Sequence, residues 1–165
     1  PRSLAGRYEV APDPEFIADF DVLDSIRFHS SISFDAENKQ YGIKYTDITA
    51  GTDRVIVLRL AEMYLIRAEA RAYSNGDMDL IKSDLNIIRN RAGLAETSAD
   101  GYAGLRLAIE HERRFEFAFE GQRWSDLVRT KRASFVLGIE ENYTLFPIPL
   151  SEMQTNEKMT QNPGY

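Results

Sequence analysis

The chain contains no cysteine, two histidines and one tryptophan among its 165 residues. The lack of cysteine excludes disulfides, thiol nucleophiles and cysteine-ligated metal ions. No His-Glu-x-x-His pattern occurs, and the side chains of Glu110, His111 and Glu112 leave a helix on different sides, so they cannot converge on one ion. A Gly-rich phosphate loop and a nucleophile-elbow serine are missing as well. The sequence therefore predicts no metal ion and no other cofactor.

The sequence also has no surplus of positive charge. It contains 20 lysines and arginines and 26 acidic residues, so the net charge is −6. Non-specific binding to nucleic acid needs a basic surface, so we expect no nucleic-acid partner. No window of the sequence approaches the length of an apolar transmembrane span. The hydrophobic content of 43% is enough for a packed core of one domain, or of one large piece of a longer chain.

The chain also lacks an initiator methionine, because its first residue is Pro1, and no signal sequence is visible. We therefore expect a fragment whose natural start is absent.

Two parts are predicted, an irregular aromatic-rich part over residues 1–57 and a helical part over residues 58–165. Alternating apolar residues suggest one short strand over residues 41–45 and another over residues 26–34. In the second part a helical stripe begins near Leu58, and a second stripe follows until Gly93 stops it. Gly76 is expected to end the first helix in a left-handed conformation, and Asp77 to cap the second. The two stripes predict an antiparallel helix pair of tetratricopeptide length, and their members are Leu58, Ala61, Leu65, Ala68, Ala72, Ile81, Leu85, Ile88 and Ala92.

The remaining sequence predicts a third helix over residues 102–119, a break at Gly121 and a shorter helix over residues 122–131. An extended run is expected over residues 143–146. Ser151 is expected to cap a short helical turn, and residues 161–165 have the composition of a turn.

Charged residues fall on the apolar face of the third helix, where Glu112 lies in line with Leu105, Ala108, Phe115 and Phe119. A carboxylate in a core must be paired, hydrogen-bonded or protonated. We predict a structural ion-pair network, with Trp124 in the core beside it and Arg123 folded back towards Glu116 by the break at Gly121. The network comprises Glu112, Glu116, Arg113, Arg114 and Arg123.

The alternative interpretation is a catalytic pair, Glu112 and Glu116, of a glycoside hydrolase. The surplus of arginine argues against it, because so many cations would hold either carboxylate ionised. Residues on adjacent turns of one helix would also lie beside each other rather than on opposite sides of a cleft.

Five segments in order resemble the C-terminal half of the SusD/RagB family, and GIKYT (Gly42 to Thr46) fits ahead of them. They are LRLAEMYLIRAEA (Leu58 to Ala70), LNIIRNRAGL (Leu85 to Leu94), ERRFEFAFEGQRWSDLVRT (Glu112 to Thr130), LFPIPLSEM (Leu145 to Met153) and QNPGY (Gln161 to Tyr165). The resemblance implies a mainly α-helical, SusD-like fold with tetratricopeptide-like helix pairs, irregular loops and a few short strands. Within the family the ERRFEFAFEGQRW segment is architectural, and the QNPGY ending suggests that the natural C-terminus is present.

The resemblance also implies a function without catalysis. Such proteins are surface-exposed outer-membrane lipoproteins of Bacteroidetes-type bacteria that bind glycans or other nutrients. They pass the ligand to a SusC-type TonB-dependent transporter, and they touch the membrane only through a lipid anchor, whose cysteine has no counterpart here. An oligosaccharide ligand is therefore expected. The family motifs do not identify the residues that bind it.

Tyrosine rings can pack on the apolar faces of sugars, so Tyr8, Tyr41 and Tyr45 are candidate ligand contacts. For each of them the favoured interpretation is a half-buried structural tyrosine whose hydroxyl finds a hydrogen-bond partner. A second hypothesis treats the chain mainly as a scaffold that docks on the transporter, with the ligand contacts elsewhere or with a ligand that is not a glycan.

Overall fold

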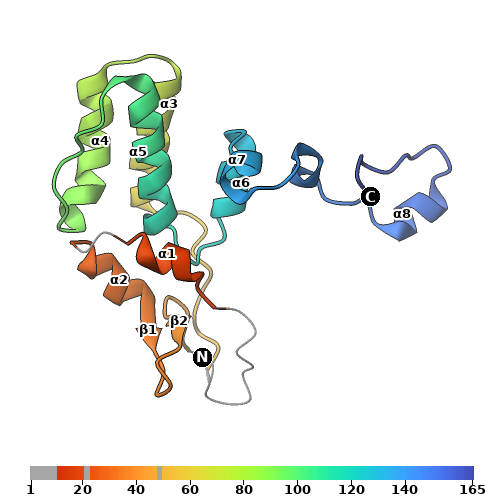
Figure 1. Ribbon diagram of the computed structural model, residues 1–165, viewed down its shortest axis with the longest axis horizontal. Coiled ribbons are helices and arrows are strands. Elements are labelled where there is room, and N and C mark those ends of the chain that lie inside the picture. The colour runs from red at the N-terminus through yellow and green to blue at the C-terminus, as the bar shows by residue number, and fades with distance from the viewer. Residues whose placement is uncertain (1–10, 21–22, 48–49) are drawn as a thin grey trace. The chain divides into compact units, whose positions relative to one another are not determined.

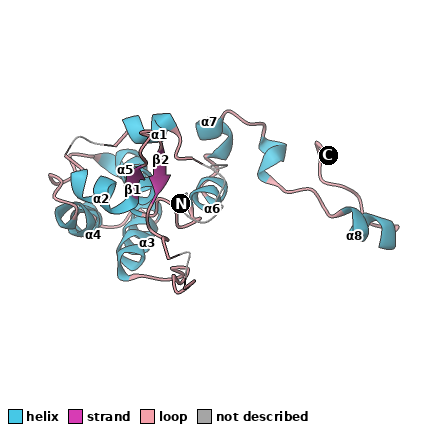
Figure 2. Cartoon of the chain, turned by 90° about the horizontal axis from the view of Figure 1, so that it is seen from below, coloured by secondary structure: helices cyan, strands magenta, loops and turns pink. Residues whose placement is uncertain are grey.

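Helices dominate the residues that the computed structural model describes, which are 11–20, 23–47 and 50–165. Figures 1 and 2 show the helices as the main regular elements, with β1 and β2 as one small hairpin. The mainly α-helical fold predicted from the sequence is confirmed. The chain divides into two compact units, Pro1–Gly121 and Gln122–Tyr165. The predicted division between residues 57 and 58, into an irregular aromatic-rich part and a helical part, stays a prediction.

The antiparallel pair of the first unit consists of α3 (Leu60–Tyr73) and α4 (Met78–Arg91), which lie side by side with α5 (Gly101–Glu116) (Figure 1). Every member of the two predicted stripes is buried except Leu58, which is 74% exposed because α3 begins only at Leu60. The small side chains of Ala61, Ala68 and Ala72 allow the helices to approach closely. Leu105 and Ile109 of α5 complete the same core cluster.

The turn between α3 and α4 differs from the prediction in one respect. Asn75, and not Gly76, takes the left-handed conformation, with φ of 54°. Gly76 is needed for close approach instead, because its N–H donates to the Arg71 carbonyl at 2.8 Å and a Cβ would lie 3.3 Å from that oxygen. Asp77 caps α4 as predicted, since its Oδ1 accepts from the N–H groups of Asp79 and Leu80.

Two side chains of α5 fasten the end of α3. The Arg106 guanidinium donates to the Ala72 carbonyl at 2.9 and 3.1 Å, and the Tyr102 hydroxyl donates to the Asn75 carbonyl at 2.9 Å. These bonds satisfy carbonyls that have no partner within the helix. The C-terminus of α5 itself lies at Glu116, three residues before the predicted end, and Phe119 follows with φ of 65°.

An N-terminal layer precedes the helix pair and comprises α1 (Pro14–Ala18), α2 (Ser25–Ser31), β1 (Ile32–Phe34) and β2 (Gln40–Gly42). The strands are antiparallel, with Ile32 opposite Gly42. The prediction of a strand over residues 26–34 is wrong for its first half, which is helix α2. Phe28 and Ile32 are spaced for a helix as well as for a strand, and the pairing of Arg27 with Asp24 one turn earlier supports the helix.

The second unit contains short helices, α6 (Arg123–Arg129), α7 (Ala133–Leu137) and α8 (Leu150–Thr155), and the 3₁₀ helix η1 (Glu141–Thr144). The predicted extended run over residues 143–146 is wrong at its start, which lies in η1. Ser151 is not a cap, because it lies within α8, whose N-cap is Pro149. Trp124 is half-buried rather than in a core, and its ring lies 5.9 Å from that of Phe146.

The QNPGY ending holds the LFPIP segment of the second unit. The Gln161 amide accepts from the Ile148 N–H and donates to the Ile148 carbonyl, at 2.7 and 2.9 Å. Asn162 donates to the Phe146 carbonyl and the Tyr165 hydroxyl donates to the Leu145 carbonyl. Side chains thus pair with the backbone of this segment as a neighbouring strand would.

Candidate functional site

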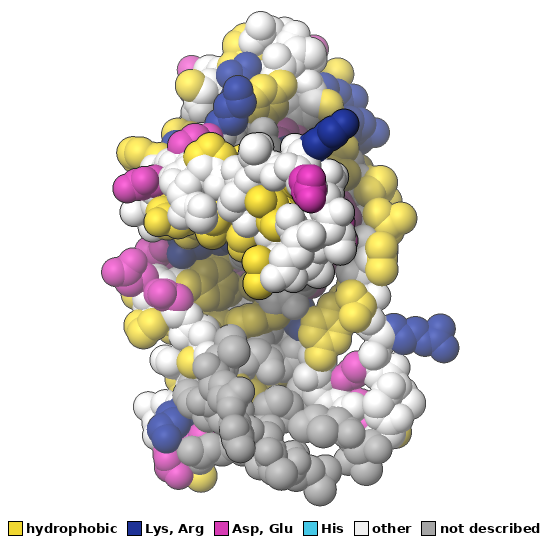
Figure 3. All heavy atoms as spheres, turned by 90° about the vertical axis from the view of Figure 1, so that its right-hand side faces the viewer, with side chains coloured by type: hydrophobic (Ala, Val, Ile, Leu, Met, Phe, Trp, Pro, Cys, Tyr) yellow, Lys and Arg dark blue, Asp and Glu magenta, His cyan; other side chains and the backbone are white. Residues whose placement is uncertain are grey.

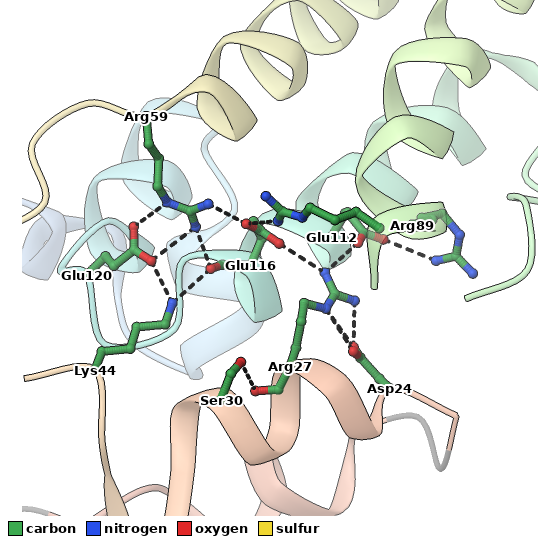
Figure 4. Close-up of polar contacts among 10 residues, drawn as sticks. Asp24, Arg27, Ser30, Lys44, Arg59, Arg89, Glu112, Glu116 and Glu120 are labelled. Carbon is green, nitrogen blue, oxygen red and sulfur yellow. Dashed lines mark hydrogen bonds and ion pairs between the residues drawn. The ribbon is translucent and has the colours of Figure 1, made fainter. Parts of the chain in front are cut away.

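The conspicuous polar feature of the first unit is a buried network around Glu112 and Glu116 on α5 (Figure 4). Glu112 is completely buried, and Glu116 is 4% exposed. They face inward because they share the α5 face of Leu105, Ile109 and Phe115. Both carboxylates must therefore find cationic partners within the protein.

Arg27 of α2 is the centre of one half of the network. Its Nη1 donates to Glu112 Oε1 at 2.5 Å and lies 3.6 Å from Glu116 Oε2, so both carboxylates share one guanidinium. Its Nε and Nη2 donate to both carboxylate oxygens of Asp24. The second oxygen of Glu112 accepts from Arg89 of α4 at 3.1 Å. This half joins three helices that are distant in sequence.

The other half surrounds the end of α5. The Glu116 carboxylate accepts from Arg59 and Arg91, and its backbone carbonyl accepts from Arg59 and Lys44 at 2.6 and 2.9 Å. Cations near the C-terminus of a helix are favoured by the helix dipole. Glu120 closes the group, because its carboxylate accepts from Lys44 at 2.5 Å and from Arg59 at 2.9 and 3.0 Å.

The network favours the ionised forms of Glu116 and Arg27. Burial would raise the pKa of Glu116, but hydrogen bonds from Arg91 and Arg59 outweigh it and hold that pKa below its ordinary value. Burial opposes the charge of Arg27, yet the hydrogen bond to Asp24 and the charge of Glu112 raise its pKa. Burial lowers the pKa of Lys44, and the hydrogen bond to Glu120 offsets only part of this effect. An ionised, saturated carboxylate is poorly suited to act as a general acid.

The arginines that neutralise Glu112 and Glu116 in these contacts were not identified from the sequence. They are Arg27, Arg59, Arg89 and Arg91. In the sequence, the only signal for these partners is the excess of arginine outside α5. The arginines that pair with Glu112 and Glu116 come from other parts of the chain, so no local spacing identifies them. Arg27, for example, is 85 positions from Glu112.

The arginines that were predicted as partners have other observed contacts. Arg114 donates to Asp19 at 2.6 Å, and its guanidinium lies over the ring of Phe16. Arg113 is buried with its guanidinium 4.9 Å from the centre of the Phe117 ring. Arg123 is half-buried at the start of α6 in the second unit. Its expected approach to Glu116 concerns how the two units meet and stays a prediction.

The candidate tyrosines lie in and after the hairpin. Tyr41 is half-buried in β2 opposite Ser33. Tyr45 is half-buried too, and its hydroxyl accepts from the Ile56 N–H at 3.3 Å. Tyr8 lies outside the described residues. The two described rings are therefore only partly accessible, and their contact with a ligand stays a prediction.

The described residues contain neither a candidate metal site nor a candidate membrane span. None of their His, Cys, Asp and Glu side chains form a group of three or more that could hold a metal ion. Within the same residues, no helix combines the length and the apolar character needed to cross a membrane.

A tetratricopeptide-like helix pair, joined to an irregular layer through a buried ionic network, defines a helical scaffold rather than a catalytic cleft. Residues 34–141 match the SusD family, and the chain belongs to this family, as its motifs predicted.

Individual relatives agree with this assignment. The starch-binding protein SusD of Bacteroides thetaiotaomicron is 35% identical over 122 residues, which cover 66% of this chain and 21% of the relative. A SusD superfamily protein of Parabacteroides distasonis superimposes with a TM-score of 0.79 at 26% identity, covering 99% of this chain and 45% of that structure. A laminarin-binding SusD-like protein superimposes with a TM-score of 0.68 at 28% identity, and the match covers 93% of this chain and 38% of that structure. The chain spans only 21–26% of the length of its curated relatives.

Proposed function

We propose that the chain is part of a glycan-binding protein that acts by binding alone. The observation that carries the proposal is membership of the SusD family, together with similarity to one relative named as starch-binding and another named as laminarin-binding. The saturated network supports binding without catalysis, because Glu112 and Glu116 both contact Arg27 and leave no gap for a substrate between them.

The finer parts of the proposal follow from the family resemblance. The full-length protein is anchored by a lipid to the outer face of the outer membrane and delivers its ligand to a SusC-type TonB-dependent transporter. Tyr41 and Tyr45 contact the ligand through the exposed parts of their rings, and Tyr8 is a third proposed contact. On the face drawn in Figure 3, Lys and Arg side chains are dispersed among acidic and apolar ones, which agrees with a ligand other than nucleic acid.

Isothermal titration of the full-length protein against a broad panel of glycans tests the binding proposal. We expect saturable heat with at least one polysaccharide and a weaker response from Tyr41→Ala and Tyr45→Ala variants. The absence of heat with every glycan of the panel would exclude a carbohydrate ligand, and the ligand would then be a peptide or another nutrient. Hydrolysis of a bound glycan that Glu116→Gln abolishes would show instead that the protein is an enzyme.

The second candidate function is a docking scaffold. It is favoured by apolar side chains on the outer side of α3, where Leu60 is 70% exposed and Met63, Ile66 and Tyr73 are exposed too. Contiguous exposed apolar residues are typical of surfaces that contact another protein. Co-purification of the full-length protein with the neighbouring outer-membrane receptor tests this function. Retention of that complex by Tyr41→Ala and Tyr45→Ala would separate docking from ligand contact, whereas its loss would place the tyrosines in the interface.

A further inference from the structure

A groove lies on the side of α4 that faces away from the helix core. Six of its lining residues recur on α4 at positions 79, 82, 83, 86, 87 and 90, a spacing that keeps them on one helix face. Glu96 and Thr97, from the loop between α4 and α5, form the opposite wall. The groove has a volume of about 440 Å³, within the range of about 300–1,000 Å³ that small-molecule sites occupy.

Hydrogen bonds hold the loop wall against α4. Arg89 donates to the Ala95 carbonyl at 2.8 Å, and the Asn86 amide oxygen accepts from the Thr97 N–H at 2.9 Å. Lys82 lies 3.6 Å from Asp100. The loop therefore runs back along α4 in a fixed register, as Figure 1 also shows. A ligand would meet a wall that is already ordered and would not have to order it.

Several groove side chains keep their hydrogen-bonding capacity. Those of Ser83, Asn90 and Glu96 are exposed and have no hydrogen-bond partner among the residues that the structure describes. Asn and Ser both donate and accept, and a carboxylate accepts at two oxygens. Ile87 adds one partly exposed apolar surface to the same face.

The lining chemistry narrows the class of ligand. An anion is disfavoured, because Asp79 and Glu96 outnumber the single cation of Lys82. A divalent metal ion is disfavoured as well, since no three metal-ligating side chains of the described chain gather here. A neutral polyol matches best, because its hydroxyls donate and accept alternately and its C–H surface can rest on Ile87.

We propose that this groove is a glycan subsite that holds one or two sugar rings of a neutral oligosaccharide. The proposal rests on the glycan-binding function proposed above and adds a location on other elements than those that carry Tyr41 and Tyr45. Asn90, Ser83 and Glu96 make the polar contacts with the sugar, and Ile87 supports one ring face. A weak subsite of this kind increases the affinity for a long polysaccharide, because a second contact with the same polymer forms at a high effective concentration.

Two variants of the full-length protein test the subsite. Asn90→Ala combined with Glu96→Gln removes polar contacts, and Ser83→Arg fills the groove while keeping a good helix former. Ser98→Arg is the matched control, because Ser98 is exposed on the same loop but does not line the groove. Thermal unfolding establishes that each variant is as stable as the unmodified protein.

The probes are starch and laminarin, measured by affinity electrophoresis, with maltoheptaose and laminarihexaose in hydrogen exchange. We expect both groove variants to bind the preferred polysaccharide on the order of tenfold more weakly, and Ser98→Arg to bind it unchanged. The preferred oligosaccharide should slow exchange over residues 82–97 in the unmodified protein and not in the groove variants. Glycan binding that both groove variants retain in full would overturn the subsite and leave the proposed function intact. Failure of the unmodified protein to bind these probes and every glycan of the broad panel would overturn both.

Discussion

Small and aliphatic side chains form the contact between α3 and α4, where one buried carboxylate, Asp84, pairs with two arginines of α3. The N-terminal layer meets α5 through an aromatic cluster around Phe115 and through a more extended network of arginines, a lysine and carboxylates. Ala61, Ala68 and Leu65 represent the first kind of contact. Arg27 and Glu112 represent the second. Apolar packing depends on volume and tolerates similar shapes, while a buried ion pair fails when one partner is removed, because the other charge stays buried. Both contacts of the first unit thus combine apolar packing with buried charge, and the contact between the layer and α5 contains the more extended ionic network.

The largest expected effect on stability comes from removing the buried charge of Glu112 at the centre of the ionic network. Glu112→Ala leaves Arg27 and Arg89 without one partner and is expected to lower the free energy of unfolding by about 3–5 kcal/mol. Urea unfolding of the full-length protein measures it, with the exposed Glu157→Ala as control. A loss below about 0.5 kcal/mol would show that the network does not stabilise the fold.

The dependence of stability on pH tests the same network through the carboxylate of Glu116. The pKa of Glu116 is held below its ordinary value near 4.5, so the folded state binds the proton more weakly than the unfolded state. The stability from this group is therefore complete above about pH 4.5 and is lost as the pH falls through the depressed pKa. Unfolding curves from about pH 7 to about pH 3 should show the gap between the unmodified protein and Glu116→Gln closing in acid. A gap that widens in acid would contradict the assignment.

The apolar contact is tested by adding volume. Ala68 is completely buried, so Ala68→Leu is expected to cost about 1–3 kcal/mol through overpacking. Ala70→Leu is the matched control, because Ala70 is exposed on the same helix. Added salt should leave the Ala68→Leu effect unchanged, since no charge is altered. Equal costs for the two variants would mean that α3 and α4 are not closely packed at Ala68.

The smallest effect is expected at the turn that joins the pair. Asp77→Ala removes the side-chain cap of α4 and should cost about 1 kcal/mol. Asp79→Ala should cost less, because Asp79 acts on the helix dipole without capping the helix. Thermal unfolding of both variants gives the comparison, and a larger cost for Asp79→Ala would exclude Asp77 as the cap.

Local patterns predicted the helix pair because every signal lay within a few residues. The stripes, the cap at Asp77 and the break at Gly121 depend on neighbours along the chain. The errors arose where two local solutions compete. Residues 26–31 fit both a strand and a helix, and at the α3 turn Asn75 tolerates the left-handed conformation that was expected of Gly76.

The sequence by itself determined the helical pair, the family and the burial of Glu112, because a carboxylate in an apolar stripe must turn inward with its helix. Only the tertiary structure decided which cations neutralise it. Arg27 and Arg59 lie 85 and 57 positions from Glu112 and Glu116, and no periodicity links such distant residues. The groove beside α4 was decided in the same way, because it exists only where a loop folds back along a helix face that looks, in the sequence, like ordinary solvated surface.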